Sequence, residues 1–250
     1  METLVSEVNA WLADRSITET GALVFANGPT GQPVLVLYLL YNGDSEEGKK
    51  KFERFTKLGP VLHQDQTIPY IQLNQLINPS STHGDCRHSR GNFVPTVPTG
   101  IPLELVKVVF DAWHKATQEN PAIVKTITVW ELYSPENWSK VPSNATAYVH
   151  RKPAYNMNTL TRWTDPSFTP QAIAISRSFD AVFVETRAKH FAPELVGEGG
   201  YTNYLDEDAQ KASQDVAHKR FGSNYPRLVE VKSKYDPENI FSKWFPIVPK

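Results

Sequence analysis

The stretch ALVFANGPTGQPVLVLYLLY, residues 22–41, predicts the centre of the fold. Two runs rich in β-branched and aromatic residues, 22–26 and 34–41, flank the turn-forming cluster 27–31. Runs of this kind joined by asparagine, glycine and proline are typical of an antiparallel hairpin. The second run is apolar at every position, which predicts a strand in the centre of a covered sheet, buried on both faces.

Helical and extended patterns are mixed along the rest of the chain. Apolar residues at helical spacing predict helices over residues 3–12, 45–58, 103–118 and 171–190. Further extended runs predict strands over residues 62–67, 126–132, 146–151 and 155–163. Strands and helices do not alternate regularly, which favours an α+β fold with a mainly antiparallel sheet covered by helices. We expect one domain over residues 1–250.

The composition argues against several classes of partner. The chain has 26 basic and 27 acidic residues, and the basic run 49–51 directly follows two glutamates, as on a solvated helix face. Nucleic-acid binding needs clustered cations, so we expect none. We also expect no membrane span, no export signal and a cytoplasmic protein. Cys86 is the single cysteine, which excludes internal disulfides.

Residues 78–100 form a stretch rich in glycine, proline and charged side chains. We predict a long polar loop there, of a length that is commonly functional or disordered. His83, Asp85 and His88 have a spacing that a metal ion can use, but no second group of ligands completes the set. The sequence therefore predicts no metal site.

Three segments near the end of the chain carry the most specific pattern. They are Tyr201-Thr202-Asn203-Tyr204-Leu205-Asp206, Gly222-Ser223-Asn224-Tyr225-Pro226-Arg227-Leu228 and Lys232-Ser233-Lys234-Tyr235-Asp236-Pro237-Glu238-Asn239-Ile240-Phe241. Together they resemble the tail of the berberine bridge enzyme family of FAD-linked oxidases, and residues 145–151 resemble the family strand that ends in His-Arg. The resemblance covers about residues 20–250 and implies the family's substrate-binding half, with 201–250 as its C-terminal segment.

The resemblance does not extend to a flavin-binding half. Family members begin with a domain whose glycine-rich loops cradle the FAD pyrophosphate, and no such loop between a strand and a helix occurs in this sequence. We therefore expect no cofactor. We also expect a homodimer, because pairing two copies would bury the face that a flavin domain covers in the family.

The family motif assigns candidate catalytic residues. The tyrosine that matches a base beside the flavin is Tyr204, which at neutral pH is better suited to donate a hydrogen bond to a developing oxyanion, and a purely structural role is the alternative. The carboxylate base of many relatives aligns with Asn156, which cannot take a proton. Glu131 is a second candidate for the pocket carboxylate, and His150 is either a structural histidine or a pocket acid or base.

Strand alternation assigns the remaining candidates on the strands, because residues two apart share a face, whereas Asn203 comes from the motif, beside Tyr204. The predicted catalytic residues are Tyr204, His150 and Glu131. The predicted substrate-binding residues are Asn156, Asn158, Tyr148, Trp130 and Asn203. The favoured function is a flavin-independent, redox-neutral cyclase or isomerase acting on a polycyclic or polyketide-like small molecule. One half of a split FAD-dependent oxidase and a non-catalytic small-molecule-binding protein are the alternatives.

Overall fold

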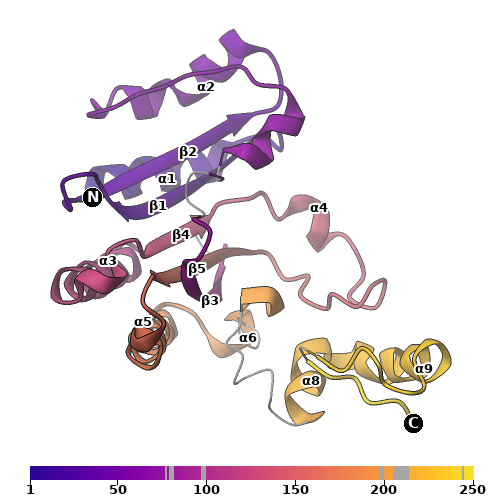
Figure 1. The fold of residues 1–250 in the computed structure, drawn as a ribbon. Helices are drawn as coiled ribbons and strands as arrows, with labels where there is room; N and C mark the ends of the chain where they lie inside the picture. Colours follow the sequence, from indigo (N-terminus) through magenta and orange to yellow (C-terminus); the bar gives the residue numbers. More distant parts are fainter. Residues whose placement is uncertain (77, 79–81, 97–99, 197–199, 205–213, 244) are drawn as a thin grey trace.

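The computed structural model describes residues 1–250 except 77, 79–81, 97–99, 197–199, 205–213 and 244. Over these residues it shows one antiparallel sheet of five strands in the order β2-β1-β4-β5-β3 (Figure 1). The strands are β1 (Glu19–Asn27), β2 (Pro33–Tyr41), β3 (Cys86–Pro95), β4 (Ile127–Glu131) and β5 (Ala154–Trp163). The expected α+β fold with an antiparallel sheet is confirmed.

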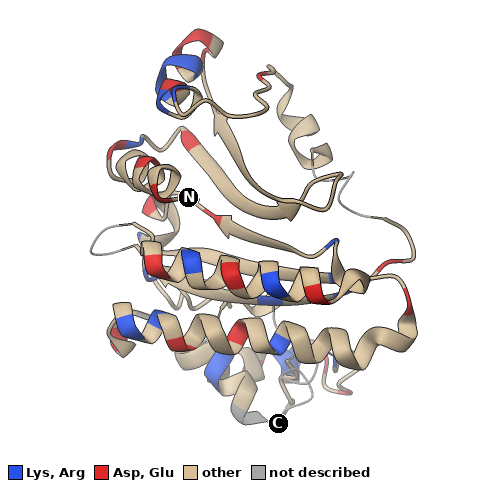
Figure 2. Cartoon of the chain, turned by 90° about the vertical axis from the view of Figure 1, so that its left-hand side faces the viewer, with Lys and Arg blue, Asp and Glu red and all other residues tan. Residues whose placement is uncertain are grey.

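Three helices cover one face of the sheet: α1 (Glu2–Asp14), α3 (Leu103–Glu119) and α5 (Thr169–His190). Figure 2 shows α3 and α5 side by side, with acidic and basic residues spaced along both helices. The strand register aligns Leu37, Leu23, Trp130 and Met157 across β2, β1, β4 and β5, on the face that the helices cover. Burial of these apolar side chains between the two layers supplies the main stabilising free energy.

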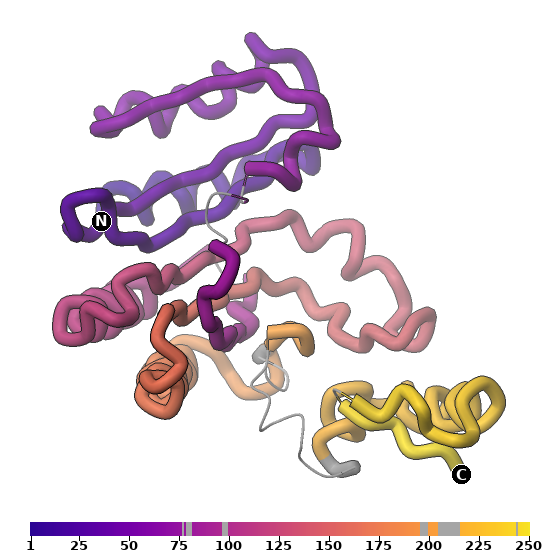
Figure 3. The backbone as a smooth tube through the Cα atoms, viewed as in Figure 1, coloured from indigo at the N-terminus to yellow at the C-terminus, as the bar shows by residue number. Residues whose placement is uncertain are grey.

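The remaining elements are short, except for α2 and the helices of the C-terminal segment. They are α2 (Ser45–Thr56), η1 (Tyr70–Gln75), η3 (Pro121–Ile123), α4 (Glu136–Ser139), η4 (Pro166–Phe168), α6 (Pro193–Val196), η5 (Thr202–Tyr204), α8 (Gln214–Phe221), η6 (Gly222–Asn224) and α9 (Tyr225–Tyr235). The C-terminal residues pack around a small cluster of their own, formed by Ala217, Tyr225, Val229 and Phe245. In Figure 3 they lie at the opposite end of the molecule from the β1–β2 hairpin.

Three expectations from the sequence are wrong in detail. Residues 62–67 and 146–151 form no strand, because neither stretch pairs with another strand. The predicted polar loop 78–100 contains β3, whose polar side chains find partners on α5, so polarity does not prevent a strand there. The apolar strand β2 lies at the edge of the sheet and its side chains are half-buried or exposed, not central and covered.

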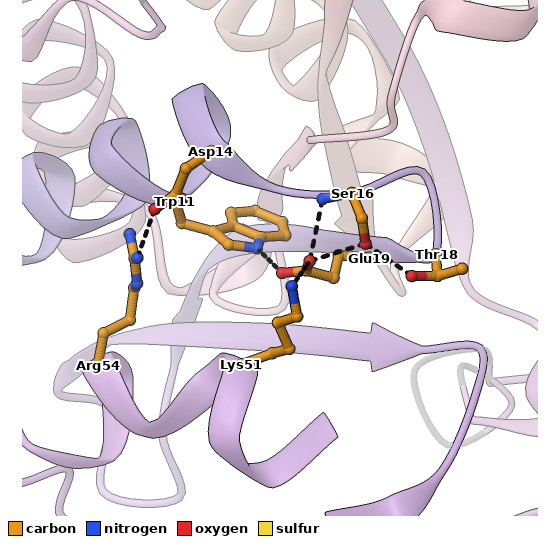
Figure 4. A network of polar contacts seen from close by, with 7 residues as sticks. All are labelled: Trp11, Asp14, Ser16, Thr18, Glu19, Lys51 and Arg54. Atoms are coloured by element: carbon orange, nitrogen blue, oxygen red, sulfur yellow. Dashed lines mark hydrogen bonds and ion pairs between the residues drawn. The ribbon is translucent and has the colours of Figure 1, made fainter. Parts of the chain in front are cut away.

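A buried carboxylate ties α1 to α2 beside β1 (Figure 4). Glu19 is 2% exposed; its carboxylate accepts hydrogen bonds from Trp11 Nε1 at 2.9 Å and from the Ser16 backbone N–H at 2.9 Å, and Lys51 Nζ lies 3.4 Å away. Arg54 Nη2 of α2 also donates to Asp14 Oδ2 of α1 at 2.7 Å. Each oxygen of the buried carboxylate thus has a donor, so its charge is compensated.

Glu19→Ala should lower the free energy of unfolding by about 3 kcal/mol, because it leaves the buried Trp11 N–H without its acceptor and Lys51 without its counter-charge. Urea unfolding followed by circular dichroism measures the change. Glu53→Ala is the matched control, since Glu53 pairs with Lys57 on the exposed side of α2 and its loss should cost less than about 1 kcal/mol. Equal losses in both variants would contradict the role given to Glu19.

Candidate functional site

The candidate site lies on the face of the sheet that α1, α3 and α5 leave uncovered, called here the open face. Alternation along β4 and β5 places Glu131 and Asn156 on this face, directly opposite each other in the register. Asn158 follows two residues along β5 and faces Val129 of β4. The apolar side chains that share the open face include Val24, Val36, Ile127, Val129 and Leu160.

Three side chains on the open face form a hydrogen-bonded group, called here the Glu131 cluster. Tyr204 OH donates to Glu131 Oε1 at 2.9 Å, and Asn156 Nδ2 donates to Glu131 Oε2 at 2.7 Å. Asn156 Oδ1 is buried and has no hydrogen-bond partner among the described residues. The cluster therefore combines a carboxylate, a phenol and an amide oxygen whose capacity to accept a hydrogen bond is unused.

Two glycines allow Tyr204 to reach the sheet. A Cβ on Gly91 of β3 would lie 2.7 Å from Tyr204 Cβ, and a Cβ on Gly200 would lie 1.9 Å from the Gly91 carbonyl oxygen. The segment 200–204 thus crosses β3 in a contact that only glycine permits at these two positions. This crossing brings a residue from near the C-terminus to a carboxylate in the middle of the chain.

The position of Tyr204 determines its protonation. Burial and the neighbouring Glu131 carboxylate raise the pKa of Tyr204 well above its ordinary value, because both disfavour the phenolate. The hydroxyl is therefore protonated at neutral pH and acts as a donor. This supports the interpretation of Tyr204 as a hydrogen-bond donor over that of a base.

A row of aromatic rings leads from the Glu131 cluster to His150. The ring centroids of Tyr204 and Tyr201 are 5.1 Å apart, those of Tyr201 and Tyr148 6.2 Å, and those of Tyr148 and His150 5.5 Å. His150 also contacts Phe93 of β3, with centroids 5.2 Å apart. Burial, followed by the charge of Arg220, lowers the pKa of His150, which favours a neutral ring.

The structure brings Tyr204, Glu131 and Asn156 together, and it places the other predicted residues except Trp130 around them. Asn158 Oδ1 accepts a hydrogen bond from Ser89 Oγ at 2.8 Å on the same face. Asn203 is exposed and donates to Tyr201 OH at 2.7 Å. Trp130 is 0% exposed and packs in the core on the covered face, so its predicted contact with a substrate is wrong.

The spacing of His83, Asp85 and His88 does not produce a metal site. Asp85 Oδ2 accepts a hydrogen bond from Arg162 at 2.8 Å, whereas His88 Nδ1 lies 2.8 Å from Ser176 Oγ beneath α5. Across the described part of the chain, no group of three or more histidine, cysteine, aspartate or glutamate side chains could hold a metal ion. No described helix has both the length and the apolar character needed to span a bilayer.

Sequence reasoning missed Gly91 and Phe93 as parts of the site. Both lie in the stretch predicted to be a loop, so their place opposite β5 in the sheet could not be derived. A glycine within an extended pattern is the signal for a close approach of another segment, and it was hidden because the pattern around it is polar. Residues 205 and 206 of the first C-terminal motif lie outside the described residues.

Comparison with known proteins shows which proteins the chain is similar to. The family model described as berberine and berberine like matches residues 200–244. An FAD-linked oxidoreductase of Dictyostelium discoideum is 24% identical over 208 residues, covering 83% of this chain and 41% of that protein. An FAD-linked oxidoreductase of Aspergillus terreus is 25% identical over 231 residues, covering 88% and 45%. The chain thus spans less than half the length of these curated relatives.

Solved structures show the same fold. The structure of a berberine-bridge-enzyme-like protein, number 28, from Arabidopsis thaliana aligns with a TM-score of 0.73 and 17% identity, covering 100% of this chain and 54% of that chain. Berberine bridge enzyme from Eschscholzia californica aligns with a TM-score of 0.70 and 17% identity, covering 100% and 53%. The resemblance inferred from the sequence is confirmed: the chain is similar to the C-terminal, substrate-binding half of these proteins.

The starts of α2 and α5 do not suit the phosphates of FAD. A pyrophosphate needs unoccupied backbone N–H groups at a helix start. At the start of α2, the Asp44 carboxylate already accepts the N–H groups of Glu46 and Glu47, whose own side chains are acidic. At α5, Pro170 lies in the first turn and removes a donor. The chemistry considered below therefore uses only side chains of this chain.

Gly91→Ala should separate Tyr204 from Glu131 without unfolding the sheet, because the added methyl group overlaps Tyr204 Cβ. We expect a loss of about 1–3 kcal/mol in the free energy of unfolding, together with a change in the NMR shift of Tyr204 labelled on its ring. Gly28→Ala is the control, since its Cβ would meet Val34 at an ordinary 3.5 Å. An unchanged Tyr204 signal in Gly91→Ala would contradict the close crossing.

The lowered pKa of His150 makes stability depend on pH. Folding disfavours the protonated ring, so this contribution is fully present above about pH 6.5, the unfolded value, and decreases as the pH falls toward the lower pKa of the folded state. Urea unfolding gives the free energy of unfolding at pH 7.5 and at pH 5.5. The decrease between the two pH values should be smaller in His150→Gln than in the unchanged protein. His83→Gln is the control at an exposed position, and it should show the same decrease in the free energy of unfolding as the unchanged protein.

Proposed function

We propose that the open face binds a small organic molecule and that the Glu131 cluster moves a proton in a redox-neutral isomerisation or cyclisation. The observation that carries this proposal is the paired hydrogen bonding of Glu131, with Tyr204 OH on one oxygen and Asn156 Nδ2 on the other. These two hydrogen bonds fix the orientation of the carboxylate. Each oxygen keeps a further lone pair with which to accept a substrate proton.

The three side chains suit three parts of such a reaction. Glu131 would take a proton from an acidic C–H or O–H group of the substrate. Once Glu131 has taken the proton, the Tyr204 hydroxyl, which stays protonated, would turn its hydrogen bond from Glu131 to the negative charge that develops on the substrate oxygen. Asn156 Oδ1, which has no partner among the described residues, would orient a substrate hydroxyl. The proton taken by Glu131 would return to another atom of the substrate, so that no electrons are gained or lost.

The surroundings of the cluster favour a substrate with an apolar body. Val129 of β4 and Leu160 of β5 share the open face with Glu131 and are half-buried, and Val24 of β1 lies beside them. Apolar walls with a few fixed polar groups are typical of small-molecule sites. A polycyclic or polyketide-like compound that carries a carbonyl and a hydroxyl group has this combination of features.

A second candidate function follows from the partial coverage of the relatives. A chain that spans 45% of an FAD-linked oxidoreductase and aligns with about half of solved relatives suits the substrate-binding part of a two-part oxidase. In that case the flavin would lie on another polypeptide segment, and the Glu131 cluster would face the substrate as proposed above. If a ligand binds but is never converted, the chain is a binding protein without catalytic activity.

We further propose that residues 1–250 act as one substrate-binding domain in the cytoplasm, and that two copies associate through the edge strand β2, away from the Glu131 cluster. The apolar side chains of β2, half-buried at the edge of the sheet, support a partner surface there. Light scattering at micromolar concentration measures the mass, and a monomer would contradict the dimer.

Glu131→Gln should slow conversion of a hydroxylated polycyclic ketone by about 100-fold or more, because the amide cannot take the proton. Tyr204→Phe should slow it by roughly 10- to 1000-fold. Turnover by the purified chain without added flavin, followed by liquid chromatography and mass spectrometry, measures both rates. Glu53→Gln is the matched control, since Glu53 is exposed on α2 and pairs with Lys57, away from the Glu131 cluster.

The mass of the product separates the candidate functions. A product of unchanged mass supports the redox-neutral reaction. A product that has lost two hydrogens, formed only when a flavin-containing partner is added, supports the two-part oxidase. If all variants bind and convert the compound equally, the Glu131 cluster is not the site.

A further inference from the structure

A second hollow lies away from the Glu131 cluster, between α4 and the segment that leads into β5. It has a volume of about 560 Å³. Its walls are formed by Ser139, Lys140, Val141, Pro142, Ser143, Val149, Arg151, Lys152 and Pro153. We call it the 139–153 hollow. None of the functions proposed above uses it.

The charge of the 139–153 hollow is one-sided. Lys140, Arg151 and Lys152 line it, and no carboxylate is among its lining residues. A hollow of similar size, about 520 Å³, lies between α1 and α2, and there four acidic side chains balance four basic ones. A concave surface with one sign of charge attracts ligands of the opposite sign. The 139–153 hollow therefore favours an anion, whereas the hollow between α1 and α2 does not.

The walls of the hollow are held by contacts from the C-terminal segment. Asn224 Nδ2 donates to the carbonyl oxygens of Ser143 at 2.6 Å and Thr146 at 2.9 Å. A Cβ on Gly222 would lie 3.4 Å from Val149 Cγ2, so the backbone of η6 packs directly against this wall. A segment without regular secondary structure is thereby fixed at three points.

Arg151 is the cation best placed to hold an anion. Its Nη2 donates to Thr146 Oγ1 at 2.8 Å and its guanidinium lies 5.1 Å from the centre of the Tyr148 ring, and both contacts orient it. Its Nε is buried and has no hydrogen-bond partner among the described residues. Lys140 pairs with Glu136 at 2.7 Å, and Lys152 donates to the Glu194 carbonyl oxygen, so these two cations are already engaged.

Apart from Ser139 and Ser143, the uncharged part of the lining is apolar. Val141, Pro142, Val149 and Pro153 offer a surface to a hydrocarbon group but no counter-charge. An inorganic anion would contact the cations and leave these apolar side chains exposed to water. An organic anion would contact the cations and also bury the apolar side chains.

We propose that the 139–153 hollow binds an organic anion with an apolar body, such as an aromatic carboxylate or sulfonate. Arg151 binds the anionic group, and Val141 and Val149 contact the apolar body. The site is separate from the Glu131 cluster, and Tyr148 lies between the two as the ring on which Arg151 stacks.

The test uses 1-anilinonaphthalene-8-sulfonate, an aromatic sulfonate whose fluorescence rises on binding. Arg151→Met should weaken its binding about tenfold, since a charge-assisted hydrogen bond is lost while the side-chain length is kept. Arg54→Met is the matched control: Arg54 lines the hollow between α1 and α2, where the charges balance, so binding should be unchanged. NMR shifts of the Val141 and Val149 methyl groups on titration locate the probe.

The remaining outcomes also decide the proposal. If Arg151→Met does not fold, Arg151→Lys gives the same comparison: it keeps a charge but loses the planar fork of donors, with at least a threefold weaker binding expected. Equal binding by the Arg151 and Arg54 variants, or shifts confined to other methyl groups, would overturn the proposal. Displacement of the probe by inorganic phosphate at equal concentration would show that the hollow binds anions by charge alone. That result would overturn the proposal that it also binds an apolar body.

Discussion

The pairing of β4 with β5 is the constraint on which the site depends. In this register Trp130 faces Met157 toward the helices, and Glu131 faces Asn156 on the open face. A shift of the pairing by one residue would exchange the two faces and place a carboxylate in the core and an indole in solvent. The free energy gained by burying Trp130 therefore also fixes the place of Glu131, although the two side chains do not share a face.

The elements that come from local pattern were predictable from the sequence. The β1–β2 hairpin, α3 and α5 follow from short-range periodicity, and the α+β class follows from their order. The predictions that failed concern strands whose place depends on tertiary partners. The polar side chains of β3 resemble those of a loop until His88 and Asn92 are seen to meet Ser176 and Asp180 of α5. The position of β2 at the edge likewise depends on strand order, which no local signal encodes.

The candidate site, too, was only partly predictable from the sequence. Tyr204 and Asn156 were reached through the family motif, and Glu131 through strand alternation, yet only the structure joins them in one hydrogen-bonded group. Trp130 was misplaced because a half-exposed face and a buried face have the same period of two, and the period does not say which is which. Gly91 escaped notice because its role is to leave space for a residue more than a hundred positions away.

The order of the strands also bears on how the molecule assembles and comes apart. β1 and β2 are joined by a short turn, so their pairing closes only a small loop, whereas β3 must find β5 across the whole of α3 and β4. The entropic cost of closing a loop grows with its length, so the hairpin can form early and the β3–β5 ladder late. The segment 200–204 can dock only on a finished β3. The hairpin can therefore form before the half of the sheet that carries Glu131 is in place, and the contact between Tyr204 and Glu131 can form only after β3 has paired with β5.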